Sequence, residues 1–150
     1  MNRKPTTVRT VLSAGGFALT LGLVAVGTAS PALAAQNPSI TATPATGLTD
    51  GQLVSVTTSD YPANSGVIAA QCALPEPGVQ VCDWANAAFF GTDDSGEGTS
   101  SLVVRVTFDG NTPDGQPYGS IDCSTVAGGC LIGAIDTGYT TETATPISFG

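Results

Sequence analysis

Histidine is absent from this 150-residue chain, and lysine occurs once, as Lys4. These absences exclude a catalytic group of the Ser-His-Asp or Cys-His type, and they exclude a lysine base or Schiff base beyond the amino terminus. Pairs of carboxylates are the catalytic option that remains, at Asp93-Asp94, within residues 109–114 and at Glu76. The first two segments are typical of turns. The sequence therefore predicts a protein that is not an enzyme.

Long hydrophobic runs are absent beyond residue 34, and basic residues are scarce. Three of the four basic residues, at positions 3, 4 and 9, precede an apolar run over residues 11–26, and small residues up to Ala34 follow it. This order is typical of a secretory signal peptide. An uncleaved membrane anchor is the alternative, but the apolar run is short, rich in glycine and ends in an A-x-A site. We expect cleavage after Ala34 to remove residues 1–34, leaving a secreted, extracellular domain at residues 35–150 with no membrane association.

Removal of the leader leaves Arg105 as the one basic residue against twelve acidic residues, a formal net charge of −11. A charge of this sign and size argues against direct binding of nucleic-acid phosphates or anionic membranes. It also favours solubility, and we expect a monomer. The same field is compatible with a cationic or amine-bearing ligand, or with a basic protein partner.

Strand-forming residues dominate the expected domain, in which valine, isoleucine, threonine, serine and glycine are common. Short apolar or alternating runs between turn signals predict seven strands, at residues 39–43, 53–57, 67–72, 88–92, 100–108, 118–123 and 144–149. The clearest alternation predicts that one strand face, made of Leu102, Val104, Val106 and Phe108, points into the core. The length suits one domain. We therefore expect a single all-β domain that is a sandwich of two sheets.

The four cysteines, Cys72, Cys82, Cys123 and Cys130, have the even number typical of disulfides in an exported protein. A zinc site is the competing interpretation, but neither spacing gives a close C-x2-4-C knuckle and histidine is absent. A calcium loop of the D-x-D-x-D-G type is also missing, so we expect no metal site. Of three possible connectivities, we expect Cys72 with Cys82 and Cys123 with Cys130, because each pair brackets a turn-rich segment.

Several segments occur in an order that resembles one known family. They are residues 44–56 (PATGLTDGQLVSV), Gln71-Cys72-Ala73, residues 102–105 (LVVR), residues 118–123 (YGSIDC) and the closing Ile147-Ser148-Phe149-Gly150. Together with the ten-residue step between Cys72 and Cys82, these segments resemble the neocarzinostatin family over about residues 39–150.

This resemblance implies a seven-stranded immunoglobulin-like β-sandwich in which two disulfide-stapled ribbons flank a ligand cleft. It implies an apoprotein without an intrinsic cofactor that binds, stabilises and carries a small, apolar, enediyne-type chromophore non-covalently. The chromophore is a labile DNA-cleaving antibiotic, so any antimicrobial action and DNA contact would belong to the cargo. An apolar pocket buries most of a drug-sized ligand, which would keep water and thiols away from it.

The family's pocket, carried over position by position, implies seven ligand-binding residues: Leu74, Gln80, Phe89, Phe108, Pro113, Leu131 and Ile135. Leu74 replaces a large aromatic residue that the family can place two positions after the first cysteine. Gln80 replaces an apolar residue, and Leu131 and Ile135 align with polar ones. The family can show a pair of aromatic residues in the loop after Arg105, and this pair aligns near Asn111 and Pro113. In this chain Phe108 is the nearby aromatic ring.

For each aromatic residue the alternative to a site role is packing in the core. Phe89 and Phe90 are adjacent, so we expect one to face inward and the other outward or into the cleft. Trp84 either caps the core or lines the pocket.

Two other functions remain open at this point. A secreted immunoglobulin-like surface or protein-interaction module would have the same fold with a filled cleft and no chromophore. A carboxylate-dependent hydrolase would lose its activity on Asp-to-Asn substitution.

Overall fold

The computed structural model describes residues 37–150. The expected signal peptide and its cleavage site lie outside the described residues. Within residues 37–150, no helix is long and apolar enough to cross a membrane.

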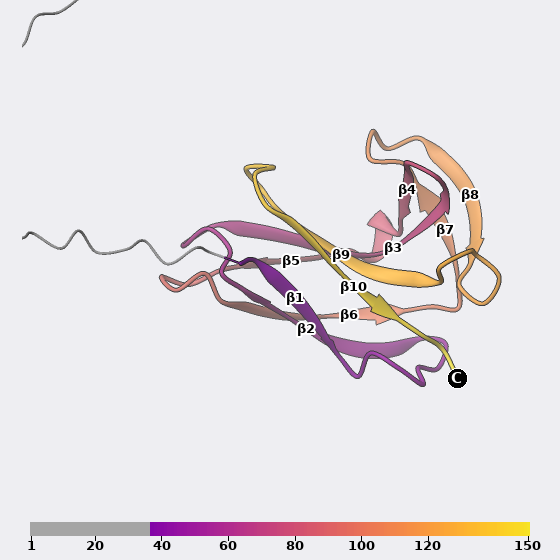
Figure 1. The fold of residues 1–150 in the computed structure, drawn as a ribbon, viewed down its shortest axis with the longest axis horizontal. Helices are drawn as coiled ribbons and strands as arrows, with labels where there is room; N and C mark the ends of the chain where they lie inside the picture. The colour runs from indigo at the N-terminus through magenta and orange to yellow at the C-terminus, as the bar shows by residue number, and fades with distance from the viewer. Residues whose placement is uncertain (1–36) are drawn as a thin grey trace, which may run out of the picture. The chain divides into compact units, whose positions relative to one another are not determined.

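Ten strands and one short 3-10 helix make up the described part of the chain (Figure 1). The strands are β1 (Ser39–Thr43), β2 (Gln52–Ser59), β3 (Gly66–Glu76), β4 (Val79–Cys82), β5 (Ala88–Gly91), β6 (Gly98–Val104), β7 (Thr107–Asn111), β8 (Pro117–Asp122), β9 (Cys130–Asp136) and β10 (Glu142–Ile147). The 3-10 helix η1 (Trp84–Asn86) lies between β4 and β5.

The strands form two antiparallel sheets. The smaller sheet has the order β1-β2-β6, and the larger has the order β10-β9-β3-β4-β7-β8. The strand β5 pairs with the first part of β3, and β4 pairs with its last part. Figure 1 shows β4, β7 and β8 grouped at one end of the two layers. The predicted all-β immunoglobulin-like sandwich is confirmed, although with more strands than the seven expected.

The extra strands have physical causes. The strand β9 is largely buried on both of its faces, so its sequence lacks the polar alternation that identifies a half-buried strand. The expected strand at 100–108 is in fact two strands, because the chain leaves the smaller sheet after Val104 and enters the larger one at Thr107. At this crossing the Val106 N–H donates to Asp50 Oδ1 at 2.9 Å. Val106 is therefore only half-buried rather than a core residue as predicted.

One core lies between the two sheets. Val54 and Val56 on β2 and Val104 on β6 are fully buried, and they pack with Val67 and Ile132 of the larger sheet. Burial of each such aliphatic side chain is worth about 1.5–3 kcal/mol. The alternation predicted for Leu102, Val104 and Phe108 is confirmed, since all three are in this core.

Both disulfides have the predicted pairing. Cys72 and Cys82 are directly opposite each other in the β3–β4 pair, and their sulfur atoms are 2.06 Å apart. Cys123 and Cys130 join the end of β8 to the start of β9. Each disulfide closes a short loop and so lowers the conformational entropy of the unfolded chain. This stabilises the folded state by about 2–3 kcal/mol per disulfide.

A buried glutamine connects β3 to the crossing between the sheets. The side chain of Gln71 accepts a hydrogen bond from the Arg105 N–H at 2.8 Å and donates one to the Arg105 carbonyl oxygen at 2.6 Å. Its Nε2 also lies 3.1 Å from the sulfur of Cys123. One side chain thus satisfies both backbone groups of the residue at which the chain changes sheets.

We expect the substitution Gln71→Met to destabilise the protein by about 2 kcal/mol, because it keeps the volume but leaves the two backbone groups of Arg105 without a partner. Urea unfolding followed by tryptophan fluorescence measures this loss. The control Gln116→Met changes an exposed loop position and should alter stability by less than about 0.5 kcal/mol. Equal unfolding midpoints for wild type and Gln71→Met would contradict the role given to Gln71.

Candidate functional site

The larger sheet has an apolar outer face, on the side opposite the core. On β3, alternate residues Val67, Ala69 and Ala73 pack in the core, while Ile68 and Cys72 lie on the opposite face. The strand β9 divides in the same way. These two adjacent strands therefore need a second cover over their outer face.

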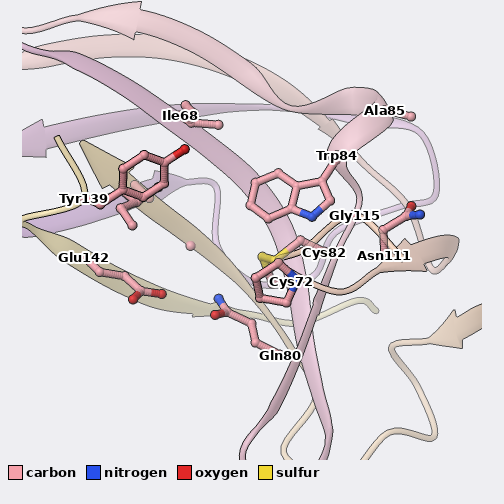
Figure 2. Close-up of a pocket in the computed structure, with 14 residues that line it drawn as sticks. Ile68, Cys72, Gln80, Cys82, Trp84, Ala85, Asn111, Gly115, Tyr139 and Glu142 are labelled. Carbon is pink, nitrogen blue, oxygen red and sulfur yellow. A yellow bond between two sulfur atoms is a disulfide. The ribbon is translucent and has the colours of Figure 1, made fainter. Parts of the chain in front are cut away.

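That cover is incomplete and leaves a cleft of about 690 Å3. Its lining comes from β3, β4, η1, β7 and the loop after it, β9, the β9–β10 turn and the start of β10 (Figure 2): Ile68, Cys72, Gln80, Cys82, Trp84, Ala85, Asn111, Pro113, Gly115, Gly133, Ala134, Ile135, Tyr139 and Glu142. The volume lies within the range of sites for drug-sized molecules. The lining is mainly apolar, as such sites require.

Gly133 gives the floor of the cleft its depth. A Cβ atom built at this position would lie 3.5 Å from the sulfur of Cys72 and 3.6 Å from Nε2 of Gln80, which are ordinary contacts. The position therefore has room for a Cβ atom. Because Gly133 lies in the lining, we expect a longer side chain to extend into the cleft.

The wall on one side is formed by the disulfide and by η1. Asp83 is buried and caps η1, because its carboxylate accepts hydrogen bonds from the backbone N–H of Asn86 at 3.3 Å and from its side-chain amide at 2.8 Å. The indole N–H of Trp84 donates to the carbonyl oxygen of Thr112 at 3.4 Å. These bonds fix the Trp84 ring beside the Cys72–Cys82 disulfide, as Figure 2 shows. Trp84 therefore lines the cleft.

The two ribbons beyond the sandwich are linked to each other. The β3–β4 hairpin is closed by the disulfide, and β4 pairs with β7 between Cys82 and Asn111. Farther out, the phenol of Tyr118 on β8 donates to the carboxylate of Glu76 on β3 at 3.0 Å. This hydrogen bond raises the pKa of Tyr118. The ribbons therefore support each other.

The opposite wall is the β9–β10 turn, which Asp136 organises. The Asp136 carboxylate is buried and accepts hydrogen bonds from the backbone N–H groups of Gly138, Thr140 and Thr141, and from the Thr140 hydroxyl. Burial raises the pKa of Asp136, but the N–H groups of Thr141, Thr140 and Gly138 outweigh burial and hold this pKa below its ordinary value. The turn presents Tyr139, whose side chain is 76% exposed, at the rim of the cleft.

Three of the seven residues expected to bind ligand lie in the cleft lining: Gln80, Pro113 and Ile135. Ile135 pairs with Ile68 across the floor. Contact of these residues with a ligand stays a prediction.

The other four expected ligand-binding residues lie elsewhere. Phe108 is 4% exposed and is part of the core. Leu131 is half-buried against the Cys72–Cys82 pair, just outside the lining. Leu74 is near the tip of the ribbon and is 49% exposed. Phe89 lies on β5, one strand beyond the floor, and is 71% exposed, while its neighbour Phe90 packs against the core as the strand alternation predicted.

Sequence reasoning missed Tyr139 and Glu142, which come from the β9–β10 turn and the start of β10. The sequence pattern does not predict β9, so no strand register places the turn that follows it. The one usable signal is Asp136 followed by Thr137 and Gly138, a combination typical of a side-chain-capped turn.

Residues 37–150 contain no group of three or more His, Cys, Asp or Glu side chains that could hold a metal ion. Glu142 is the one charged side chain in the lining described above. The site is thus suited to binding an apolar molecule by shape, with a few polar contacts from Gln80, Asn111, Tyr139 and Glu142.

A β-sandwich with a drug-sized, largely apolar cleft and a disulfide in its wall defines a small-molecule-binding protein. The chain belongs to the neocarzinostatin family, since the model of that family matches residues 40–149. The predicted membership is confirmed over nearly the whole segment expected.

The known relatives support this assignment. The antitumor antibiotic C-1027 apoprotein and actinoxanthin, both from Streptomyces globisporus, are each 44% identical over 122 residues, which cover 78% of this chain and 83% of each relative. The solved structure of macromomycin matches with a TM-score of 0.69 at 33% identity, covering 76% of this chain and 100% of macromomycin.

The depressed pKa of Asp136 predicts a pH-dependent contribution to stability. Its pKa in the folded protein lies below the unfolded value of about 3.9, so the stabilisation is complete above that pH and is lost as pH falls through the folded pKa. We expect Asp136→Asn to be less stable than wild type at about pH 7, and the difference to shrink at about pH 2. Urea unfolding at both pH values measures this.

The control Asp109→Asn removes the same charge from an exposed position on β7. It should change stability little at either pH. A gap between wild type and Asp136→Asn that is equal at both pH values would show that the charged form of Asp136 does not hold the turn.

Proposed function

We propose that the protein is a secreted apoprotein that carries a small, largely apolar, enediyne-type chromophore, bound non-covalently in the cleft. The observation that carries the proposal is the open cleft of about 690 Å3 on the outer face of β3 and β9. The naming of one relative as an antibiotic apoprotein supports this type of ligand. The protein itself needs no cofactor for this role.

The construction of the cleft suits storage of a labile molecule. The disulfide and the capped helix η1 hold one wall, and Asp136 holds the other, so little ordering is needed on binding. A ligand between these walls exchanges water for apolar side chains such as Ile68 and Ile135. Enclosure of this kind slows attack by water or thiols on a reactive cargo.

Catalysis by the protein itself has little support. Glu142 has no second carboxylate beside it in the lining, so paired-carboxylate hydrolysis lacks its partner there. Asp93, an earlier candidate, accepts hydrogen bonds from Ser95 and Glu97 within its own turn. We infer that the protein acts as a monomeric carrier. Its net charge of −11 after removal of the leader disfavours binding to nucleic-acid phosphates, so we infer that any contact with DNA is made by the cargo.

An immunoglobulin-like interaction module, the alternative function, requires a filled cleft. Gly133, in the floor of the cleft, has no side chain with which to fill it. This observation favours the carrier.

The experiment that tests the proposal is solvent extraction of the protein isolated from the organism that encodes it, followed by mass spectrometry of the extract. We expect a chromophore from the wild-type protein. The variant Gly133→Leu should yield at least about tenfold less, because its side chain extends into the cleft from a position where a Cβ atom fits.

The matched control is Gly91→Leu, at the end of β5, where a Cβ atom would meet only the Ser65 carbonyl oxygen at 3.9 Å. It should keep the wild-type yield. An extract of wild type without a bound small molecule would refute the carrier function, and an equal yield from Gly133→Leu would place the cargo elsewhere.

A further inference from the structure

The strand β8 is an open edge of the larger sheet. It is the last strand in the order β10-β9-β3-β4-β7-β8, and it pairs with β7. Within residues 37–150 no strand follows it in the sheet, and Figure 1 shows it as the outermost strand at its end of the two layers. An edge strand presents backbone N–H and C=O groups with which a strand of another chain can pair.

The pairing register shows which backbone groups of β8 point outward. The Cys123 N–H donates to the Val106 carbonyl oxygen at 2.8 Å, directly beyond the last residue pair of β7 and β8. In an antiparallel pair, every second residue directs both of its backbone groups to the partner strand. Cys123 and Ile121 therefore face β7. Ser120 and Asp122, which alternate with them, direct their backbone groups to the open edge.

The open edge is short. The N–H groups of Thr125 and Val126 donate to the Asp122 carbonyl oxygen, so this group already has partners. The register shifts near the start of β8, and regular pairing with β7 runs from Gly119 to Asp122. The N–H and C=O of Ser120 and the N–H of Asp122 are the groups that an added strand would meet. They match a segment of about five residues, the usual length of a strand.

Carboxylates lie beside this edge, on the side away from the core. Ile121 is buried in the core, whereas Asp109 on β7 is exposed and lies directly opposite Ser120. Asp122 is two residues along the strand from Ser120, so its side chain is on the same side. The Ser124 N–H and hydroxyl donate to the Asp122 carboxylate at 2.9 and 2.6 Å and hold its pKa below the ordinary value.

These carboxylates decide which kind of strand can pair with the edge. A second copy of this chain would bring its own Asp109 and Asp122 against the same two side chains, and like charges across paired strands are destabilising. Arg105, the one basic residue within residues 37–150, lies outside β7 and β8. Lysine or arginine on an added strand would instead meet a carboxylate. The edge therefore disfavours self-pairing and favours a basic strand.

We propose that β8 binds an extended, basic segment of a partner protein, which joins the larger sheet as one more strand. Backbone hydrogen bonds to Ser120 and Asp122 hold the segment. Two Lys or Arg side chains, separated by one residue, face the carboxylate of Asp122 and, across the short side chain of Ser120, that of Asp109. This surface is outside the cleft lining, so the inference does not rest on the proposed function.

NMR titration of the secreted protein with the peptide acetyl-Thr-Lys-Val-Lys-Thr-amide tests the proposal. We expect shifts at the backbone amides of Ser120 and Asp122. Methylation of both lysine backbone nitrogens keeps the charge but removes the N–H groups that face β8, and should weaken binding at least about fivefold. Methylation of the valine nitrogen, which points away from β8, should leave the affinity unchanged. A peptide with glutamate in place of both lysines should not bind.

A pair of protein variants tests the role of the charges. Asp109→Asn should weaken binding of the lysine peptide about threefold. The control Glu97→Gln removes the same charge from an exposed turn before β6 and should leave the affinity nearly unchanged.

Each part of the proposal has a result that would overturn it. Equal affinities for the lysine peptide and its lysine-methylated form would overturn strand addition. An equal loss in Asp109→Asn and Glu97→Gln, or binding of the glutamate peptide, would overturn selection by the edge carboxylates. Absence of shifts at Ser120 and Asp122 would overturn the docking site itself. None of these results bears on the cleft.

Discussion

The cross-strand disulfide between Cys72 and Cys82 is the constraint on which the site depends. The first part of β3 is paired within the sandwich to β5 and β9, and its last part is paired to β4 outside it. The disulfide lies where these two roles meet, and its sulfur atoms belong to the cleft wall. A chain of this size has a limited core with which to hold a projecting ribbon. The covalent bond supplies rigidity that packing alone would not.

Three buried polar side chains complete the scaffold around the disulfide. Gln71 fixes the crossing between the sheets, Asp83 caps the helix that carries Trp84, and Asp136 closes the turn that carries Tyr139. Each one satisfies backbone groups that would otherwise be left unpaired, which is why each can be buried at small cost. Polar groups thus shape both walls of a site whose surface is mainly apolar.

Much of the fold could be predicted because its signals are local. The disulfide pairing followed from turn-rich segments between cysteines, and the core faces of Leu102 and Val104 followed from alternation. The strand β9 could not be recognised, because it is largely buried on both faces and has no alternation to read. Because β9 forms part of the cleft floor, its absence from the predicted strands affects the prediction of the site more than that of the fold. The family resemblance predicts Gln80, Pro113 and Ile135 in the cleft, where the structure has them. Phe108, predicted there too, packs in the core. Tyr139 and Glu142 reach the rim through the pairing register of β9 and β10, which depends on tertiary structure.

An acidic domain with a fixed, mainly apolar cleft is suited to carry a small molecule. We propose that the cargo lies between Trp84 and Tyr139, above the floor formed by β3 and β9. The most direct measurement is a set of intermolecular nuclear Overhauser effects in the natively loaded protein. We expect contacts from the cargo to the Trp84 indole and to the methyl groups of Ile68 and Ile135. Contacts confined to the outer face of the β1-β2-β6 sheet would contradict it.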